Sequence, residues 1–389
     1  MDFKKITDLD IHNKILFIRV DMNVPIHDNM ITDATRIMAS LPTIKYAMSK
    51  GAQVIVATHL GRPLEGGCKL TDSVDLIANK LSQLLGIKVP VIKDLSTPIN
   101  FGQSSLVMLE NVRCNIGEKA NATQLGKKYA ALCDIFVHDA FATAHRAEAS
   151  TDAIGYYVQE VCAGLLMSAE LDALNKAFAK PKHPITAIVA GSKVSTKLSI
   201  LENLSRKVDY LIVGGGILNT FLAATGVNVQ KSLYEESLIP QAKKILTEMQ
   251  ERGAVVPLPH KVIVAHELSL NTIATKKSVD TLDTQDMILD IATEFANDLA
   301  QIIAKSATII WNGPVGVFEF DQFANGTRII ANAVANSPAF SLAGGGDTIA
   351  AINKFGVFDK ISYVSTAGGA LLELLEGKIL PAIKLLEQR

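Results

Sequence analysis

Short, continuous apolar runs recur along the whole chain, and they predict β-strands that are covered on both faces. Strands in a sheet with one face in water would instead alternate apolar and polar residues. The runs occupy residues 15–20, 54–57, 106–109, 135–137, 185–190, 211–213, 262–264, 308–311 and 362–364. Helical periodicity lies between them, at residues 73–85, 160–178, 237–252 and 288–305. This alternation predicts an α/β fold with parallel sheets in both halves of the chain.

The chain is expected to divide near a long helical segment at about 158–179, which the sequence Lys180-Pro181-Lys182-His183-Pro184 ends. Proline cannot continue a helix, so a new strand should follow. A length of 389 residues also exceeds what one compact core usually holds. We therefore expect two domains of ordinary size.

Composition and charge exclude several classes of protein. Apolar residues make up 48% of the chain and charged residues 20%, which excludes a disordered chain. The mean hydropathy of +0.25 is high, but no apolar run approaches the roughly 18 residues of a membrane-spanning helix. The 38 basic and 39 acidic residues are evenly spread, so neither half has the basic excess of a nucleic-acid-binding protein.

The four cysteines, Cys68, Cys114, Cys133 and Cys162, show neither a CxxC pair nor zinc-ligand spacing. Buried free thiols are therefore expected, with disulfides as the less favoured alternative. The first residues form no apolar signal segment. Together these features predict a protein of the reducing cytoplasm.

Arginines follow the predicted strands of the first half. Ligands of open α/β sheets bind at the carboxyl ends of the strands, so the residues there are candidate ligands of a substrate. They are Asp21, Asn23, His59, Leu60, Gly61, Arg62, Arg113 and Arg146, with Arg36 at an expected helix start. Guanidinium groups that converge repel one another unless an anion lies between them. The pattern therefore favours a small polyanionic substrate over separate surface ion pairs, which remain the alternative for any single arginine.

Glycines follow the predicted strands of the second half, at 191–197, 214–216, 312–316, 344–348 and 366–369. Glycine lets backbone N–H groups approach an anion, and a helix start adds partial positive charge. A single such run is more often structural, but five runs with Lys193, Lys197 and Asp347 indicate a site for nucleotide phosphates. The spacing fits neither a Walker-type P-loop nor a dinucleotide fingerprint, because Asn219 and Ile349 stand where the third glycine would be.

At these motifs the chain closely resembles the phosphoglycerate kinases of bacteria, over essentially its whole length. The resemblance is carried by residues 19–25, 59–63, 110–113, 139–150, 191–198, 311–318 and 344–348. It implies two Rossmann-like domains, each a parallel sheet covered by helices, separated by a cleft. Residues 1–165 would bind 3-phosphoglycerate or 1,3-bisphosphoglycerate, and residues 166–378 would bind MgADP or MgATP. The tail at about 379–389 would pack back on the first domain.

The resemblance also implies the roles of individual residues. Substrate binding would fall to Asp21, Asn23, Arg36, His59, Leu60, Gly61, Arg62, Arg113 and Arg146. Nucleotide binding would fall to Lys197, Asn312, Glu319, Gly345, Gly346, Asp347 and Thr348, with Asp347 also on the Mg²⁺ side. The phosphoryl group in transfer would be stabilised by Arg36, Lys193, Gly368 and Gly369. Ala142 and Ala367 stand where the family usually has glycine, and Ala367 would be strained if its φ were positive.

The expected chemistry needs no general base, because the attacking carboxylate of the phosphoglycerate is already ionised at neutral pH. His59 and His145 are therefore expected to orient ligand or loop. The family implies a cytoplasmic, glycolytic monomer that closes its domains about a hinge near 158–181 and the segment entering the last helix. The alternatives are a binding protein that kept the fold without turnover and a nicotinamide-dependent dehydrogenase. The first is disfavoured by the surviving charged residues, and the second by the missing glycine spacing.

Overall fold

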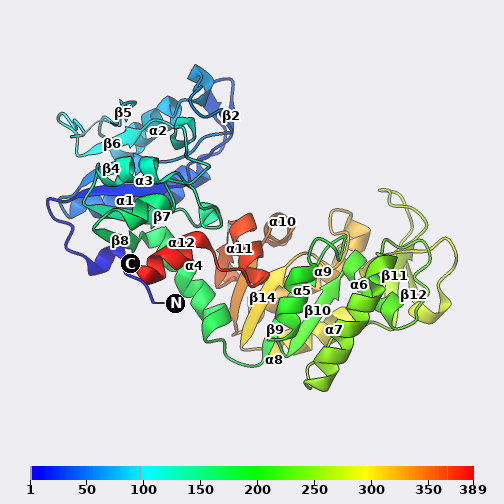
Figure 1. The fold of residues 1–389 in the computed structure, drawn as a ribbon. Helices are drawn as coiled ribbons and strands as arrows, with labels where there is room; N and C mark the ends of the chain where they lie inside the picture. The colour runs from blue at the N-terminus through cyan, green and yellow to red at the C-terminus, as the bar shows by residue number, and fades with distance from the viewer. Residues whose placement is uncertain (1, 96–97, 366) are drawn as a thin grey trace. The chain divides into compact units, whose positions relative to one another are not determined.

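The computed structural model describes residues 2–95, 98–365 and 367–389. They form two compact units. The first contains the chain up to Asp172 together with Ile379–Arg389, and the second contains Ala173–Lys378 (Figure 1). The C-terminal segment thus returns to the first unit, where the Ala382 N–H donates to the oxygen of Ala144 (3.2 Å) and Arg389 donates to the oxygen of Val158 (2.6 Å).

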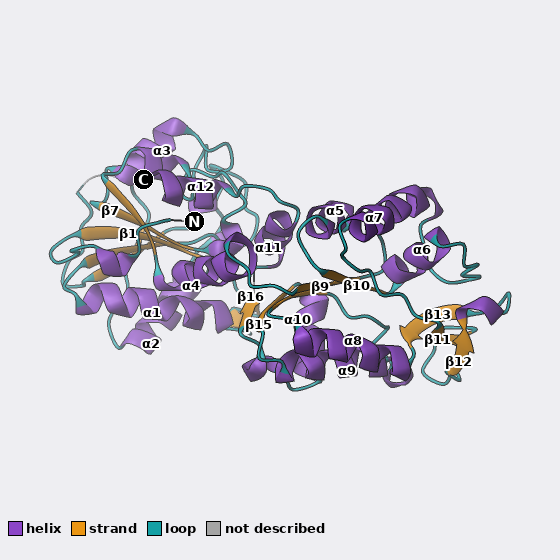
Figure 2. Cartoon of the chain, turned by 90° about the horizontal axis from the view of Figure 1, so that it is seen from below, coloured by secondary structure: helices purple, strands orange, loops and turns teal. Residues whose placement is uncertain are grey.

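The first unit is built on a parallel sheet with the strand order β5-β6-β4-β1-β7-β8. Its strands are β1 (Ile15–Val20), β4 (Gln53–Ala57), β5 (Val91–Ile92), β6 (Leu106–Leu109), β7 (Ile135–Asp139) and β8 (Glu160–Ala163). Helices α1 (Thr35–Ser49) and α2 (Asp75–Leu85) cover one face, and α3 (Thr123–Ala130) and α12 (Pro381–Gln388) cover the other (Figure 2). Strands β6 and β7 are buried throughout, and β1 and β4 are buried beyond their first residue, as their continuous apolar sequences predicted.

The second unit has its own parallel sheet, with the order β10-β9-β14-β15-β16. Its strands are β9 (Ile185–Ala190), β10 (Tyr210–Gly214), β14 (Thr308–Asn312), β15 (Phe340–Gly344) and β16 (Tyr363–Ser365). One face carries α5 (Leu198–Ser205), α6 (Gly216–Ala224), α7 (Ile239–Glu251) and α11 (Gly368–Leu375). The other carries α8 (Thr293–Lys305), α9 (Asn325–Asn336) and α10 (Gly346–Lys354). In both sheets the chain adds strands to one side of the first strand and then crosses to the other, which creates the crevice where α/β proteins bind ligands.

Some segments depart from the parallel pattern. The strand predicted at 262–264 belongs to a separate antiparallel sheet of β11 (Lys261–Ala265), β12 (Thr275–Ser278) and β13 (Met287–Ile291). A short hairpin joins β2 (Ile26–His27) to β3 (Met30–Ile31) in the first unit. The two-residue strands β2 and β3 are too short to show a period in the sequence.

Two helices predicted from periodicity begin with strands instead. The segment predicted at 160–178 starts as β8, which pairs with β7, and continues as α4 (Leu165–Leu174) and a π-helical turn at Asn175–Ala179. The segment predicted at 288–305 starts as β13 and continues as α8. A short apolar run fits either element, and pairing with a neighbouring strand decides between them. Within the described residues, no helix has the length and apolar character needed to cross a membrane.

The expectation that all cysteines are free thiols is wrong for two of them. Cys68 and Cys114 form a disulfide, with Cα atoms 5.2 Å apart, whereas Cys133 and Cys162 are free. The chain after β4 folds back on the segment after β6, where the Gly66 N–H donates to the oxygen of Cys114 (2.8 Å). A separation of 46 residues carries no sign of this contact in the sequence.

Candidate active site

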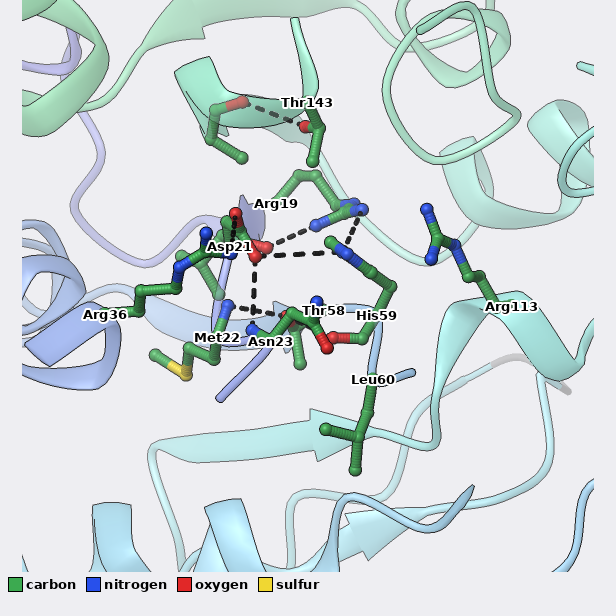
Figure 3. Close-up of polar contacts among 12 residues, drawn as sticks. Arg19, Asp21, Met22, Asn23, Arg36, Thr58, His59, Leu60, Arg113 and Thr143 are labelled. Carbon is green, nitrogen blue, oxygen red and sulfur yellow. Dashed lines mark hydrogen bonds and ion pairs between the residues drawn. The ribbon is translucent and has the colours of Figure 1, made fainter. Parts of the chain in front are cut away.

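The carboxyl ends of β6, β4, β1 and β7 lie next to one another at one edge of the first sheet. The predicted substrate residues that follow these strands are therefore brought together, as Figure 3 shows for Asp21, Asn23, His59 and Arg113. His59 is 3% exposed, and burial together with the charges of Arg19, Arg113, Arg146 and Arg36 holds the pKa of His59 well below its ordinary value. His59 is therefore neutral at physiological pH.

Asp21 links several of these side chains. Its Oδ2 accepts a hydrogen bond from Arg36 Nη1 (2.7 Å), and its Oδ1 accepts one from the Asn23 N–H (3.1 Å). The same Oδ1 lies 3.9 Å from His59 Nδ1. The Asp21 side chain is 10% exposed and that of Arg36 is 46% exposed. Arg36, near the start of α1, thus uses one donor to reach Asp21 and keeps others for a ligand.

The loop that follows β4 is held from both sides. Asn23 Oδ1 accepts from the Gly61 N–H (2.9 Å), and Arg113 Nη1 donates to the oxygen of Gly61 (2.7 Å). The Asn111 side chain binds the backbone of Leu60 twice, accepting from its N–H (3.1 Å) and donating to its oxygen (2.8 Å). Leu60 itself is buried, so it serves the site through its backbone. Asn111 belongs to the motif at 110–113 but was assigned no role, because its contact with Leu60, 51 residues away, is not visible in the sequence.

Arg62, Arg113 and Arg146 differ in their surroundings. Arg62 is exposed. The Arg113 side chain is 8% exposed, and its Nη2 lies 3.6 Å from Glu148 Oε1. Arg146 is half-buried in the loop after β7, where its Nε donates to His145 Nε2 (3.3 Å). His145 thus contacts a candidate ligand residue.

The second unit contains a cavity of about 600 Å³ at the carboxyl ends of its strands. Glycines line one part of it, and apolar side chains from segments before and after β14 line another. Glu319 and Asp347 are acidic residues of its lining. The glycine and apolar parts include Gly191, Gly215, Gly216, Gly316, Leu233, Leu268, Met287, Leu289 and Val317.

Two of the glycines are required by the backbone itself. Gly215 has φ +63°, and a Cβ there would lie 2.7 Å from the oxygen of Gly191. Gly313 has φ +111°, and a Cβ there would lie 2.0 Å from the oxygen of Ala190. Side chains cannot occupy such positions, so adjacent strand-end loops pack backbone against backbone. This structural requirement explains part of the glycine pattern, and the N–H groups of both glycines donate within the fold, Gly215 to the oxygen of Val315 (3.1 Å) and Gly313 to the Thr348 hydroxyl (2.8 Å).

Lys197 and Asn312 lie behind the glycine loops. Lys197 Nζ donates to the oxygens of Ala190 (2.6 Å) and Asn312 (3.2 Å), and burial lowers the pKa of Lys197 to about 8, against the opposing charge of Asp347. Asn312 Nδ2 donates to the oxygen of Gly344 (2.8 Å), while Asn312 Oδ1 is buried without a partner among the described residues. A buried acceptor without a partner marks Asn312 as a position whose hydrogen bonding the fold alone does not complete.

The Thr348 hydroxyl already has partners in the fold. It accepts from the Gly313 N–H (2.8 Å) and donates to the oxygen of Gly344 (2.9 Å). It therefore connects β14 to β15 and positions the loop that contains Gly313. This is a structural role in addition to any contact with a nucleotide.

The other predicted residues of the second unit lie in strand-end loops or at helix starts. Lys193 is exposed in a loop that Glu235 anchors, because Glu235 accepts hydrogen bonds from the N–H (2.7 Å) and hydroxyl (2.6 Å) of Ser195. Glu235 was not predicted, since it follows no strand. The remaining four are Gly345 before α10, Gly346 at its first position, and Gly368 and Gly369, the first two residues of α11.

Ala367 does not carry the strain considered for it. Its φ is −94°, an ordinary value, and it is buried just before α11. Ala142 is not among the described non-glycine residues with positive φ. Thr366, the first residue of this predicted glycine run, lies outside the described residues.

Comparisons with known proteins show relatives of this chain in sequence and in fold. The sequence model of the family described as phosphoglycerate kinase matches residues 6–378. The structure of phosphoglycerate kinase from Coxiella burnetii is 48% identical over the full length of both chains, with a TM-score of 0.97. The crystal structure of phosphoglycerate kinase from Pyrococcus horikoshii OT3 is 31% identical, covers 99% of this chain and 98% of that chain, and has a TM-score of 0.76.

Proposed function

Since the chain belongs to the phosphoglycerate kinase family, we propose that its first unit binds the three-carbon acid and its second unit binds the nucleotide. The reaction is the reversible transfer of a phosphoryl group between 1,3-bisphosphoglycerate and ADP, which yields 3-phosphoglycerate and ATP in glycolysis. The enzyme is a kinase whose acceptor, in the ATP-consuming direction, is a carboxyl group.

The gathering of arginines around His59 and Asp21 is the observation that carries the assignment of the acid site. Two guanidinium groups about 6 Å apart repel by about 3 kcal/mol at an effective dielectric constant near 20. Asp21 and Glu148 offset only part of this charge. A substrate with a carboxylate and a phosphate would supply the rest. We assign it to Asp21, Asn23, Arg36, His59, Arg62, Arg113, Arg146 and the backbone of Leu60 and Gly61.

The cavity of the second unit supports the nucleotide assignment. Its apolar walls suit a base, and the start of α6 at Gly216, which lines the cavity, suits phosphates. Glu319 would accept hydrogen bonds from the ribose hydroxyls, as the family resemblance implies. Lys197, Asn312, Gly345, Gly346 and Thr348 would lie along the phosphates. The nucleotide would enter with Mg²⁺, which binds phosphates, waters and one or two carboxylates, and Asp347 is the proposed carboxylate.

The chemistry then consists of positioning and charge stabilisation. The carboxylate of the acid substrate attacks the terminal phosphoryl group of ATP without a general base. Arg36, Lys193 and the N–H groups of Gly368 and Gly369 would stabilise the charge on the phosphoryl oxygens. Because the substrates are assigned to different units, transfer requires domain closure, which also excludes water from the acyl phosphate. We further propose that the enzyme acts as a cytoplasmic monomer, as the glycolytic family implies; the disulfide between Cys68 and Cys114 removes the free-thiol argument for that compartment.

A coupled assay with ATP and 3-phosphoglycerate tests the acid-site assignment. Arg36→Ala should lower kcat by at least about 100-fold while the Kd for MgATP stays within about twofold, since Arg36 is assigned to the acid and to the phosphoryl group in transfer and to no other part of the nucleotide. Arg328→Ala is the matched control, because Arg328 lies on α9 and contacts Asn325. Collapse of nucleotide affinity with unchanged kcat in Arg36→Ala would overturn the assignment. A wild-type protein that binds both substrates without turnover would favour the binding-protein alternative.

A further inference from the structure

A chain of buried polar groups lies behind the proposed acid site. Arg19, in the middle of the sheet on β1, is fully buried, and its Nε donates to Ser150 Oγ (2.9 Å). The Ser150 hydroxyl donates in turn to Glu118 Oε1, and Glu118 Oε2 accepts from the hydroxyl of Tyr129 (3.3 Å). Ser150 and Glu118 are also fully buried. None of these residues has a role predicted from the sequence.

The other side of the Arg19 guanidinium faces the site. Arg19 Nη1 donates to the oxygen of Val20, and Arg19 Nη2 lies 3.3 Å from His59 Nδ1. Figure 3 shows Arg19, His59 and Asp21 pointing toward one another. A guanidinium group has only donors, so His59 Nδ1 must accept. Because His59 is neutral, its proton is then on Nε2.

Asp21 would favour the opposite arrangement. Its Oδ1 lies 3.9 Å from the same Nδ1, and a carboxylate is a hydrogen-bond acceptor. Without Arg19, a small movement of the ring would allow an Nδ1–H to bind Asp21 and would leave Nε2 as an acceptor. An acceptor there repels an anionic ligand oxygen, whereas an Nε2–H donates to it. The position of Arg19 thus decides whether His59 attracts or repels the substrate.

We propose that Glu118 and Ser150 are positioning residues of the acid site, which hold Arg19 so that His59 stays in its Nε2–H form. This proposal deepens the proposed function. The part of it that concerns substrate binding rests on that function. The buried charge of Arg19 needs a compensating group, and Glu118 supplies it through the Ser150 hydroxyl. Glu118 lies 99 residues beyond Arg19 in the chain, and the contact depends on η3 (Val112–Cys114) and the loop after β7 being brought together.

The tautomer of His59 in the ligand-free protein is the direct test. Long-range ¹H–¹⁵N spectra of histidine-labelled protein distinguish a protonated from an unprotonated ring nitrogen, and His59→Gln identifies the signals of His59. Burial raises the pKa of Glu118 to about 7, so the spectra belong at pH 8, where its carboxylate is mostly ionised. The wild type should show an unprotonated Nδ1 and a protonated Nε2. A protonated Nδ1 in the wild type would overturn the proposal.

Variants test whether Ser150 and Glu118 position Arg19 or only stabilise the fold. Ser150→Ala should shift His59 toward the Nδ1–H form and raise the KM for the acid substrate roughly 10-fold or more, the range of one hydrogen bond to a charged group. The KM for ATP should not change. Ser168→Ala is the matched control, because Ser168 is a buried serine of the same unit whose hydroxyl has no partner among the described residues. Glu118→Gln should shift the tautomer and raise the KM in the same direction, by a smaller factor. It replaces Ser150→Ala in the test if that variant does not fold.

An unchanged tautomer and an unchanged KM in folded Ser150→Ala or Glu118→Gln would reduce these residues to a purely structural role and overturn the proposal. The spectra do not depend on turnover. Failure of the wild type to bind 3-phosphoglycerate would therefore overturn the proposed function while leaving the result on His59 interpretable.

Discussion

The disulfide between Cys68 and Cys114 should stabilise the first unit by restricting the conformations of the unfolded chain. It closes a loop of 46 residues, for which the loss of loop entropy corresponds to about 4 kcal/mol at 25 °C. The native contacts nearby do not depend on the bond, because Glu65 also joins the two segments by accepting from the N–H groups of Gly117 (3.0 Å) and Lys119 (2.7 Å). Reduction should therefore leave the fold intact and lower its free energy of unfolding.

Thiol titration establishes the starting state. In urea without a reductant, two thiols should react, those of Cys133 and Cys162, and four should react after reduction. Urea unfolding of oxidised and reduced protein is then followed by far-ultraviolet circular dichroism. The single tryptophan, Trp311, is buried in β14 and reports separately on the second unit.

The circular dichroism transition should move to lower urea on reduction, by the equivalent of up to about 4 kcal/mol. Cys68→Ser should show the same shift without any reductant, and Cys133→Ser should not show it, because Cys133 is free. Coincident unfolding curves for the oxidised and reduced protein, once titration has shown that two further thiols appear, would refute the reasoning.

Three further predictions concern the second unit and the whole chain. Lys197, with a pKa of about 8, should be mostly protonated at pH 7 and mostly neutral at pH 9, so the affinity for MgADP measured by calorimetry should fall about 10-fold over that interval. Lys197→Arg should remove this pH dependence, and a flat profile in the wild type would contradict the assigned role. Gly215→Ala should lower the free energy of unfolding by about 1–3 kcal/mol more than Gly226→Ala does. Urea unfolding followed by Trp311 fluorescence measures both losses. Both glycines have positive φ, but a Cβ has open space within 4 Å only at Gly226, so equal losses would show that the contact with Gly191 is unimportant. The radius of gyration from X-ray scattering should fall when 3-phosphoglycerate and MgATP are added together, and an unchanged radius would count against domain closure.

Most parallel strands were predictable because they depend on local sequence. The apolar runs at β1, β6 and β9 are each buried throughout or nearly so, and a short run that is apolar on both faces suits a covered strand. Strand-end placement of His59 and Arg113 followed from the same pattern, since parallel strands present their carboxyl ends at one edge. The family resemblance then assigned roles that burial and periodicity alone do not contain.

Features that depend on which segments meet in space were not predictable. The apolar run in β11 resembles that of a parallel strand, yet β11 pairs antiparallel with β12 and β13. The path of the chain between strands sets the pairing. The bond between Cys68 and Cys114 and the contact of Glu118 with Ser150 join residues that are far apart in sequence. The amino-acid sequence thus determined the buried strands and the kinds of side chain at their ends, through local polarity and spacing. Only the tertiary structure decided which of those side chains touch, because a hydrogen bond or disulfide requires a few ångströms of proximity that no local pattern encodes.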